Sequence, residues 1–313
     1  MGTPLSGTQH LLRAGAYEAS VASVGATLRT LCHDGRHLVV GFDADEVRPA
    51  YRGVTLAPWP NRVVDGRYDF AGEEYQLPLT EPSRGHALHG LATWLDFETV
   101  DKGSDHVELA AVIEAQTGYP WRVRVATRFF LGPDGLTQTV RAENLGAAPA
   151  PFGTGPHPYL VAGSGPLDSW SFELPAAQVL HVTEDGLIPT GLAAVDADDP
   201  ARFDYRAARE IGTAEIDHAY TGLARDDGGR ATVRVTDPAG TGVELSWGLE
   251  CGWVQVHTAD LPGRGAGHRA GLAVEPMTCA PDAFNADRYG FDTGLRVIEP
   301  GGVAEASWRI AAV

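Results

Sequence analysis

The segments VRVATRFFL (residues 123–131) and LTQTVRAEN (residues 136–144) decide the fold, because apolar and polar side chains alternate along both of them. Alternation with a period of two is typical of β-strands that bury one face. The connection between the segments contains Asp134-Gly135, a dipeptide that favours a hairpin because both turn residues tolerate positive φ. The stretch therefore predicts neighbouring antiparallel strands.

Strand patterns continue on both sides of this hairpin. Asp-Gly recurs at Asp34-Gly35, Asp65-Gly66 and Asp185-Gly186, and the segment RVVDGRYDFAGEEYQL (residues 62–77) predicts two short hairpins. Helical periodicity is scarce, with one or two turns expected in residues 201–209 and one in residues 281–286. The other predicted strands are residues 17–28, 30–42, 107–114, 170–174, 178–182, 231–236, 242–247, 253–258 and 294–298, together with the C-terminal SWRIAAV.

The organisation of the chain is uniform. No fixed-period repeat, low-complexity tract or shift in composition marks a boundary, so we expect a single domain over residues 1–313. The strand count predicts an all-β protein built as one large antiparallel β-sandwich. The expected loops are residues 81–90, 146–165, 196–217, 226–229 and 261–271.

The composition excludes several classes of partner. The chain has 313 residues, of which 43% are hydrophobic, and a formal net charge of -17. So acidic a surface repels nucleic acid and anionic membranes. No apolar stretch approaches the roughly 18 residues that span a bilayer, and residues 1–19 lack the pattern of a signal peptide. With three widely spaced cysteines, which fit neither a disulfide framework nor a zinc site, we expect a cytoplasmic protein.

Two residues stand out as candidates for proton transfer. His157 lies between Pro156 and Pro158, which restrict the backbone on both sides and give the imidazole a fixed place. Histidine titrates near neutral pH and suits a general acid or base. Glu275 closes the apolar strand of residues 272–274 and precedes a proline. Partial desolvation there would raise the pKa of its carboxyl group toward that of a useful base.

Three weaker clusters carry further candidates. Arg62, in the loop of residues 57–62, could grip sugar hydroxyls or a carboxylate with its planar guanidinium. His86 and His89 precede Trp94 and could contact a substrate whose ring stacks on the indole, or they could simply pack the loop. A metal site is disfavoured because histidines three apart in a strand or loop point to different sides and lack a third ligand. Asp217, followed by His218, begins a possible strand.

Other catalytic motifs are missing. The sequence has neither the GxSxG of α/β-hydrolases nor a GxGxxG after a strand for a dinucleotide. The loop of residues 261–271, LPGRGAGHRAG, lacks the order of a phosphate-binding loop. It is expected to be a flexible loop, with an anion-contacting lid as the alternative. No cofactor is expected.

Taken in order, these clusters resemble the aldose 1-epimerase family. Each motif is short, but their order over about residues 15–313 makes the resemblance specific. The fold implied is the galactose mutarotase-like antiparallel β-supersandwich. The motifs that carry the resemblance are Asn61-Arg62, His86-Ala87-Leu88-His89-Gly90, His157-Pro158-Tyr159, Asp217-His218 and Glu275-Pro276.

The resemblance implies a reaction and a role for each residue. Glu275 would take the proton from the C1 hydroxyl of an aldose, and His157 would protonate the ring oxygen from the opposite side of the anomeric centre. His89 would assist at the ring oxygen or a neighbouring hydroxyl. Arg62 and Asp217 would orient the sugar through its hydroxyls. The weaker candidates to line the pocket are His86, Trp94, Tyr159 and Gln255. The partner is a small-molecule sugar, and the protein is expected to be a monomer or homodimer.

Departures from the family pattern leave the sugar open. Well-known galactose mutarotases carry Asn-His-Ser/Thr-Tyr-Phe where this chain has Pro156-His157-Pro158-Tyr159, and Gln after Glu-Pro where it has Met277. One alternative is therefore a mutarotase for a phosphorylated or sulfonated sugar, for which Arg84, Arg264 and Arg269 are available on loops. Another is a non-catalytic carbohydrate-binding protein, and a third is a β-sandwich lyase or hydrolase.

Overall fold

The computed structural model describes residues 2–261, 263, 265 and 267–313, and it confirms the predicted all-β architecture. Among these residues, nine strands form a large sheet, six form a second sheet and four form an N-terminal sheet. The pairs between the named strands are antiparallel. The predicted hairpin is present, with residues 123–132 paired to residues 135–144.

The sheets combine strands from distant parts of the chain. The large sheet has the order β10 (Glu98–Lys102), β11 (His106–Ile113), β12 (Val123–Gly132), β13 (Gly135–Asn144), β27 (Val303–Ala312), β23 (Gly242–Trp247), β22 (Ala231–Thr236), β17 (Ser171–Glu173) and β20 (Arg209–Glu210). The second sheet has the order β16 (Tyr159–Leu160), β25 (Leu272–Met277), β24 (Trp253–His257), β21 (Asp217–Leu223), β18 (Ala176–Val182) and β19 (Pro189–Ala194). The N-terminal sheet has the order β1 (Gln9–Ala14), β2 (Tyr17–Ala22), β3 (Thr27–His33) and β4 (Arg36–His37).

Short strand pairs and single helical turns connect these sheets. The pairs are β5 (Thr55–Leu56) with β15 (Gly155–Pro156), β6 (Arg62–Val63) with β9 (Ala87–Leu88), β7 (Arg67–Phe70) with β8 (Glu73–Gln76), and β14 (Ala150–Phe152) with β26 (Arg296–Ile298). The helical turns are η1 (Pro49–Tyr51), η2 (Val64–Gly66), η3 (Leu167–Ser169), α1 (Pro200–Phe203) and η5 (Ala283–Arg288). Within the described residues, no helix has the length and apolar content needed to cross a membrane.

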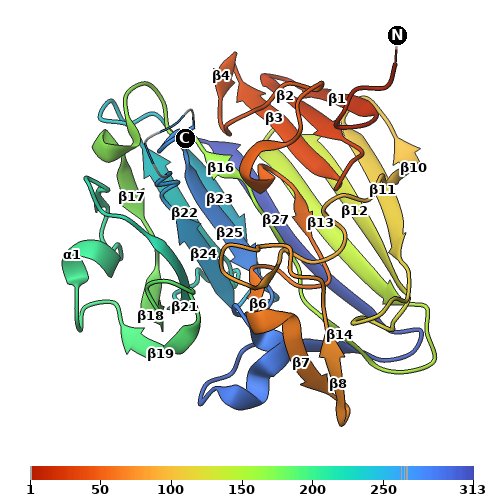
Figure 1. Ribbon diagram of the computed structural model, residues 1–313. Helices are drawn as coiled ribbons and strands as arrows, with labels where there is room; N and C mark the ends of the chain where they lie inside the picture. Colours follow the sequence, from red (N-terminus) through yellow and green to blue (C-terminus); the bar gives the residue numbers. More distant parts are fainter. Residues whose placement is uncertain (1, 262, 264, 266) are drawn as a thin grey trace.

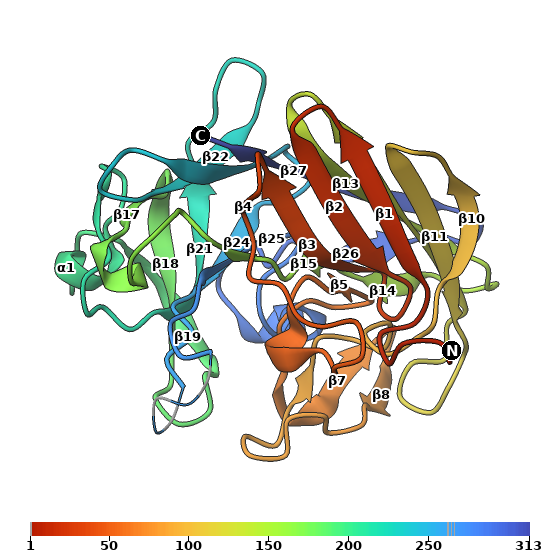
Figure 2. The same ribbon diagram turned by 90° about the horizontal axis from the view of Figure 1, so that it is seen from above.

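The sheets form layers around one apolar core. Figures 1 and 2 show the N-terminal sheet lying over β11–β13 and the second sheet over the β17–β27 half of the large sheet. The second sheet turns Tyr220, Val254 and Val274 toward this core. Because side chains alternate along a strand, the residues between them project from the opposite face, which we call the outer face of the second sheet.

The structure differs from the expected elements where strands are short or polar. The expected loop of residues 146–165 contains the strands β14, β15 and β16, whose pairing partners lie far away in the chain. In residues 201–209, the expected helix is the single turn α1, after which the chain leads to β20. β1, β10 and β19 were not predicted, because β10 is exposed throughout and β19 is polar or small at most positions.

Candidate active site

Neighbouring strands of the second sheet place polar side chains on its outer face. Gln255 of β24 lies directly opposite Glu275 of β25. Two residues further along β24, His257 lies opposite Asp217 of β21. The side-chain period of two directs all four to the same face. Alternation within three short strands thus brings together residues that are up to 58 positions apart in the chain.

Glu275 is a buried carboxyl group, with 2% of its surface exposed. Its Oε1 lies 3.4 Å from Nε2 of His157, and its Oε2 has no hydrogen-bond partner among the described residues. Burial and then the negative charge of Asp217 raise the pKa of Glu275 well above its usual range, while Arg62 acts in the opposite direction. A carboxyl group with these properties suits a general base.

His157 is held through the backbone on both sides. Its carbonyl accepts a hydrogen bond from the Gly53 N–H (2.8 Å), and the Pro158 carbonyl accepts one from the Val274 N–H (3.3 Å). Burial and then the charge of His257 lower the pKa of His157 to about 3, which keeps the free imidazole neutral. The side-chain Nδ1 is buried and has no partner among the residues described.

The contact between His157 and Glu275 differs from the arrangement expected from the resemblance. In the free protein, Oε1 of Glu275 and Nε2 of His157 are 3.4 Å apart, too close for a sugar carbon to lie between these two atoms. The atoms that remain for a ligand are Oε2 of Glu275 and Nδ1 of His157, which lack partners in the described structure.

His89 lies next to His157 in an unusual backbone conformation. Its φ is +62°, and φ of Asn61 is +52°, values that residues other than glycine rarely adopt. The His89 N–H donates to the Asn61 carbonyl (2.7 Å). The His89 ring lies 5.0 Å from the His157 ring and 4.6 Å from the Tyr51 ring. Burial, and then the charges of His157 and Arg62, lower the pKa of His89 well below its usual value.

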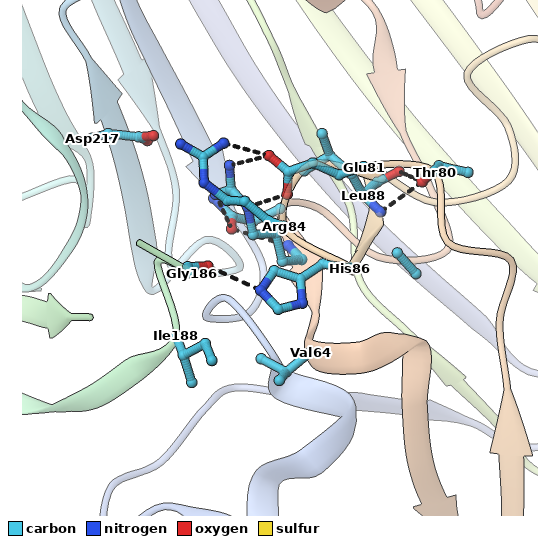
Figure 3. A network of polar contacts seen from close by, with 12 residues as sticks. Val64, Thr80, Glu81, Arg84, His86, Leu88, Gly186, Ile188 and Asp217 are labelled. Atoms are coloured by element: carbon cyan, nitrogen blue, oxygen red, sulfur yellow. Dashed lines mark hydrogen bonds and ion pairs between the residues drawn. The ribbon is translucent and has the colours of Figure 1, made fainter. Parts of the chain in front are cut away.

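Arg62 reaches the site with its guanidinium already paired. Its Nε and Nη2 donate to Oε2 and Oε1 of Glu81 (2.8 and 3.0 Å). Glu81 Oε1 also accepts from Nη1 of Arg84 (2.8 Å). Figure 3 shows Glu81 within this network, with Asp217 directed toward it from the second sheet. Burial lowers the pKa of Arg62, but the hydrogen bond to Glu81 and the charges of Asp217, Glu81 and Glu275 outweigh burial and raise it overall. The guanidinium therefore lies close enough to Asp217 and Glu275 to interact with the charges of both.

Asp217 is the more exposed carboxylate of the site, since 31% of its side chain is accessible. Its Oδ1 accepts a hydrogen bond from Nε2 of Gln255 (2.6 Å) and lies 4.0 Å from Nδ1 of His257. Burial raises the pKa of Asp217, but His257, Arg62 and the Gln255 hydrogen bond outweigh it and lower the pKa overall. Asp217 is therefore an ionised hydrogen-bond acceptor at neutral pH.

Aromatic side chains lie beside His157 and His89. The Tyr159 ring lies 5.2 Å from the His157 ring, and burial raises the pKa of its hydroxyl. Tyr51 packs on His89, and its ring lies 6.4 Å from that of Trp94. Trp94 is 55% exposed, and its indole lies 4.4 Å from the guanidinium carbon of Arg48. Trp94 is thus an exposed ring near the histidines, in contact with the Arg48 guanidinium.

His86 is placed differently from the other candidates. Its Nδ1 accepts the Asp65 N–H (3.1 Å), and its Nε2 lies 2.9 Å from the Gly186 carbonyl (Figure 3). These contacts leave no ring nitrogen for a sugar, so we assign His86 to holding the loop and not to substrate contact. Within the described part of the chain, no three His, Cys, Asp or Glu side chains have the arrangement of a metal site.

The loop arginines considered for an anionic sugar have other partners. Arg84 pairs with Glu81, and Arg269 pairs with Asp168 (2.7 Å) and Asp260 (2.8 Å). Arg264 lies outside the described residues.

Sequence reasoning missed several residues of this site, namely His257, Glu81, Tyr51 and Arg48. A signal existed for His257, because it follows Gln255 by two residues within a predicted strand and so shares its face. Glu81 lies in an expected loop, and nothing in the sequence connects it to Arg62. Tyr51 adopts a φ of +55°, which periodicity does not reveal.

The fold and the site together define an all-β protein with a buried carboxyl–imidazole pair suited to proton transfer. The family model described as aldose 1-epimerase matches residues 8–307, and the chain belongs to this family. Membership supports an isomerase that acts on a sugar.

The chain is also similar in sequence to individual proteins. The uncharacterized protein YihR of Escherichia coli K12 is 36% identical over 282 residues, covering 90% of this chain and 87% of the relative. Galactose mutarotase of Mus musculus is 28% identical over 226 residues, covering 68% of this chain and 64% of the relative.

Solved structures show the same fold at low sequence identity. The GalM/aldose epimerase homologue from C. elegans has a TM-score of 0.80 at 19% identity, covering 98% of this chain and all of the other (100%). Galactose 1-epimerase from Lactobacillus acidophilus has a TM-score of 0.78 at 18% identity, covering 97% of this chain and 94% of the other.

Proposed function

We propose that this chain is an aldose 1-epimerase, a mutarotase that interconverts the α and β anomers of a hexose by opening and closing the sugar ring. One observation carries the proposal. Four polar atoms buried at the site have no partner among the described residues, and they are Oε2 of Glu275, Nδ1 of His157, Nδ1 of His89 and Oε1 of Gln255. Buried polar atoms are nearly always hydrogen-bonded, and a hexose offers hydroxyls that would satisfy them.

The Glu275–His157 pair would hold one proton. Burial disfavours the charged form of each group, raising the pKa of Glu275 and lowering that of His157 to about 3. The resting pair is then a protonated carboxyl and a neutral imidazole. Transfer of the proton across the 3.4 Å contact gives a carboxylate and an imidazolium, which are the base and the acid that ring opening needs.

The reaction then proceeds without a net change in protons. Glu275 accepts the proton of the C1 hydroxyl while His157 protonates the ring oxygen, and the bond between C1 and the ring oxygen breaks. The open-chain aldehyde rotates about C1–C2. On closure, His157 removes the proton from the attacking hydroxyl and Glu275 returns one to the carbonyl oxygen. Each positioned proton transfer typically contributes about 10²–10⁴-fold to the rate.

Other residues would bind and orient the sugar. The ionised carboxylate of Asp217 and the guanidinium of Arg62 suit hydroxyl groups, and their own partners hold both in place. His89 would assist at the ring oxygen or a neighbouring hydroxyl through its unpartnered Nδ1. Gln255 supplies an acceptor beside Glu275, and Tyr159 and Trp94 supply aromatic surface near the histidines.

The proposal is tested by removing the acid and the base. Glu275→Gln and His157→Asn should each slow mutarotation by about 10²-fold or more, as followed by polarimetry on fresh α-D-glucose and α-D-galactose. Glu114→Gln and His106→Asn, both on the surface and in ion pairs away from the site, are matched controls that should keep the wild-type rate. Wild-type rates in either site variant would refute the assignment.

A comparison of substrates distinguishes a mutarotase for a neutral hexose from one for a phosphorylated or sulfonated sugar. Because Arg84 and Arg269 are paired with carboxylates, we favour a neutral hexose. Polarimetry with glucose and with an equal concentration of glucose 6-phosphate or a 6-sulfonated hexose compares the two, and a higher kcat/KM for the anion would reverse our preference.

The alternative of a non-catalytic binding protein predicts a different pair of results. Calorimetry would detect hexose binding, but the protein would not accelerate mutarotation at any concentration. The presence of both proton-transfer groups in one buried contact favours the enzyme.

A further inference from the structure

Glu81 carries a buried charge beside the site, outside the residues assigned to the reaction. The side chains of Glu81 and Arg62 are each 10% exposed. Burial raises the pKa of Glu81, but the hydrogen bonds from Arg62 and Arg84 outweigh this and lower it overall. Glu81 is thus a carboxylate at neutral pH, and it accepts both parallel N–H bonds of the Arg62 guanidinium (2.8 and 3.0 Å). Paired bonds of this kind fix the plane as well as the position of an arginine.

Backbone hydrogen bonds within its loop hold Glu81 in place. The Glu81 N–H donates to the His86 carbonyl (3.0 Å), and the Glu81 carbonyl accepts from the N–H groups of Arg84 and Gly85 (3.1 and 2.9 Å). Arg84 Nε in turn donates to the Asp185 carbonyl (3.2 Å). The Glu81 carboxylate therefore has a defined place relative to the β18–β19 turn (Figure 3).

The pairing has a consequence for Glu275. A buried guanidinium next to several carboxyl groups binds most strongly to the one that offers two parallel bonds. Arg62 gives its Nε and Nη2 to Glu81, and its Nη1 lies 3.4 Å from Oδ1 of Asn61. Oε2 of Glu275 has no partner among the described residues. Among the described residues, the Arg62 guanidinium thus hydrogen-bonds to Glu81 and Asn61, whereas Glu275 and Asp217 act on it through their charges alone.

We propose that Glu81 is a positioning residue for the epimerase reaction. It holds the Arg62 guanidinium in a two-bond ion pair, so that Arg62 does not hydrogen-bond to Glu275 and Glu275 stays available as the base. This inference rests on the proposed function for its catalytic consequence, while its geometric part concerns the state of Glu275 in the free protein.

The test substitutes Glu81 by Gln and by Asp. In Glu81→Gln the amide offers Arg62 one acceptor, so the guanidinium is released toward Glu275, and kcat should fall about 10- to 100-fold. Glu81→Asp keeps the charge and should recover part of the loss. Glu114→Gln is the matched control, because Glu114 accepts the same two bonds from Arg122 (2.8 and 3.1 Å) at the surface. It should keep the wild-type kcat and KM.

A second readout separates positioning from folding. Loss of the Glu81 charge and approach of Arg62 both favour the ionised form of Glu275, so its pKa should fall by about one pH unit or more. The active pair holds one proton, and ionisation of Glu275 removes it, so the basic limb of the pH profile of kcat/KM should move down equally. NMR titration of ¹³C-labelled glutamate carboxyl groups, assigned with Glu275→Gln, measures the same shift without activity. The other titratable groups near Glu275, none of which is substituted in this test, are His157, His89, His257, Asp217, Arg62 and Tyr159.

Each outcome decides between the two claims. A wild-type protein that does not mutarotate any hexose contradicts the proposed function, and the NMR titration still tests the role of Glu81. If the wild type is active while Glu81→Gln retains its kcat and pH profile, the positioning role is wrong. It is also wrong if Glu81→Gln only lowers the melting temperature and leaves the Glu275 titration unchanged.

Discussion

At the scale of single residues, burial lowers the pKa of several histidines of this protein. His157 and His89 are both buried, and desolvation is the largest cause lowering the pKa of each. The same effect reaches His218, which directly follows Asp217 in β21 but projects from the other face of the strand. Its ring packs against Phe203 at 4.8 Å, and its Nδ1 accepts the Asp217 N–H (3.2 Å).

His218 therefore makes the folded protein sensitive to acid. Burial, and then the charge of Arg202, lower its pKa from 6.5 to about 4. Below pH 6.5 the unfolded chain binds a proton that the folded chain does not, so stability is lost as the pH falls from 6.5 toward 4. The difference corresponds to at most about 3 kcal/mol.

We expect His218→Asn, whose side-chain oxygen can accept the Asp217 N–H, to remove this loss. Urea unfolding at pH 7.5 and pH 4.5 should give a smaller drop in the free energy of unfolding for the variant than for the wild type. His33→Asn, at a partly exposed position, serves as the control. Equal drops in wild type and His218→Asn would contradict the assignment.

How far the sequence predicts the site depends on the kind of restraint. His157 was identifiable because its neighbouring prolines limit its backbone, and Glu275 because an acidic residue follows an apolar run and precedes a proline, although β25 continues past it to Met277. The bond from Gln255 to Asp217 and the pairing of Arg62 with Glu81 depend on sheet register and loop docking. These contacts join residues 38 and 19 positions apart, and no local pattern encodes them.

At the scale of elements, Gly90 allows the loop that carries His89 to lie close against the backbone of Ala57. Gly90 has a φ of +77°, and a Cβ there would overlap the backbone carbonyl of Ala57. This carbonyl also accepts the N–H groups of Leu91 and Ala92 (2.8 and 3.0 Å). The β6–β9 pair is thereby fastened to the segment that precedes Arg62.

Gly90→Ala should cost about 3 kcal/mol or more of stability, because it adds a backbone clash to the strain of positive φ. Gly85→Ala is a matched control in the same loop, since φ of Gly85 is +72° and a Cβ would meet nothing within 4 Å. It should cost only about 1 kcal/mol. Urea unfolding measures both values, and equal costs would mean that the close approach to Ala57 is unimportant. Mutarotation should also be slower in Gly90→Ala, because His89 is the adjacent residue.

Elements were predictable where their own sequence stabilises them. β12 and β13 alternate regularly over ten residues each, and they lie where the pattern places them. β5, β9, β15 and β16 have two residues each, too few for any periodicity. They exist because distant segments dock on one another, so they became visible only with the tertiary structure.

At the scale of the whole molecule, the large sheet draws strands from both halves of the chain, whereas the strands of the second sheet all come from the second half. The large sheet joins β10–β13 to β17, β20, β22 and β23 through the C-terminal strand β27, and the second sheet places β16 beside β25. The sequence predicted most of the longer strands but not this order, since strand order is decided by packing across the core. We propose that the chain folds as one cooperative unit.

The C-terminal strand provides the test of this unit. β27 pairs with β13 on one side and β23 on the other, and its Trp308 donates to Oε1 of Gln138 (3.0 Å) within the core. Removing residues 303–313 would expose two long inner edges and the apolar face beneath them. We therefore expect the truncated chain to lose its cooperative thermal transition and to aggregate, whereas removal of residues 2–5 should leave a single transition with equal calorimetric and van't Hoff enthalpies. A truncated chain that melts in two separate cooperative transitions would show that each half folds independently. That outcome would contradict the single unit, because the strand joining the two halves of the large sheet would then contribute nothing essential.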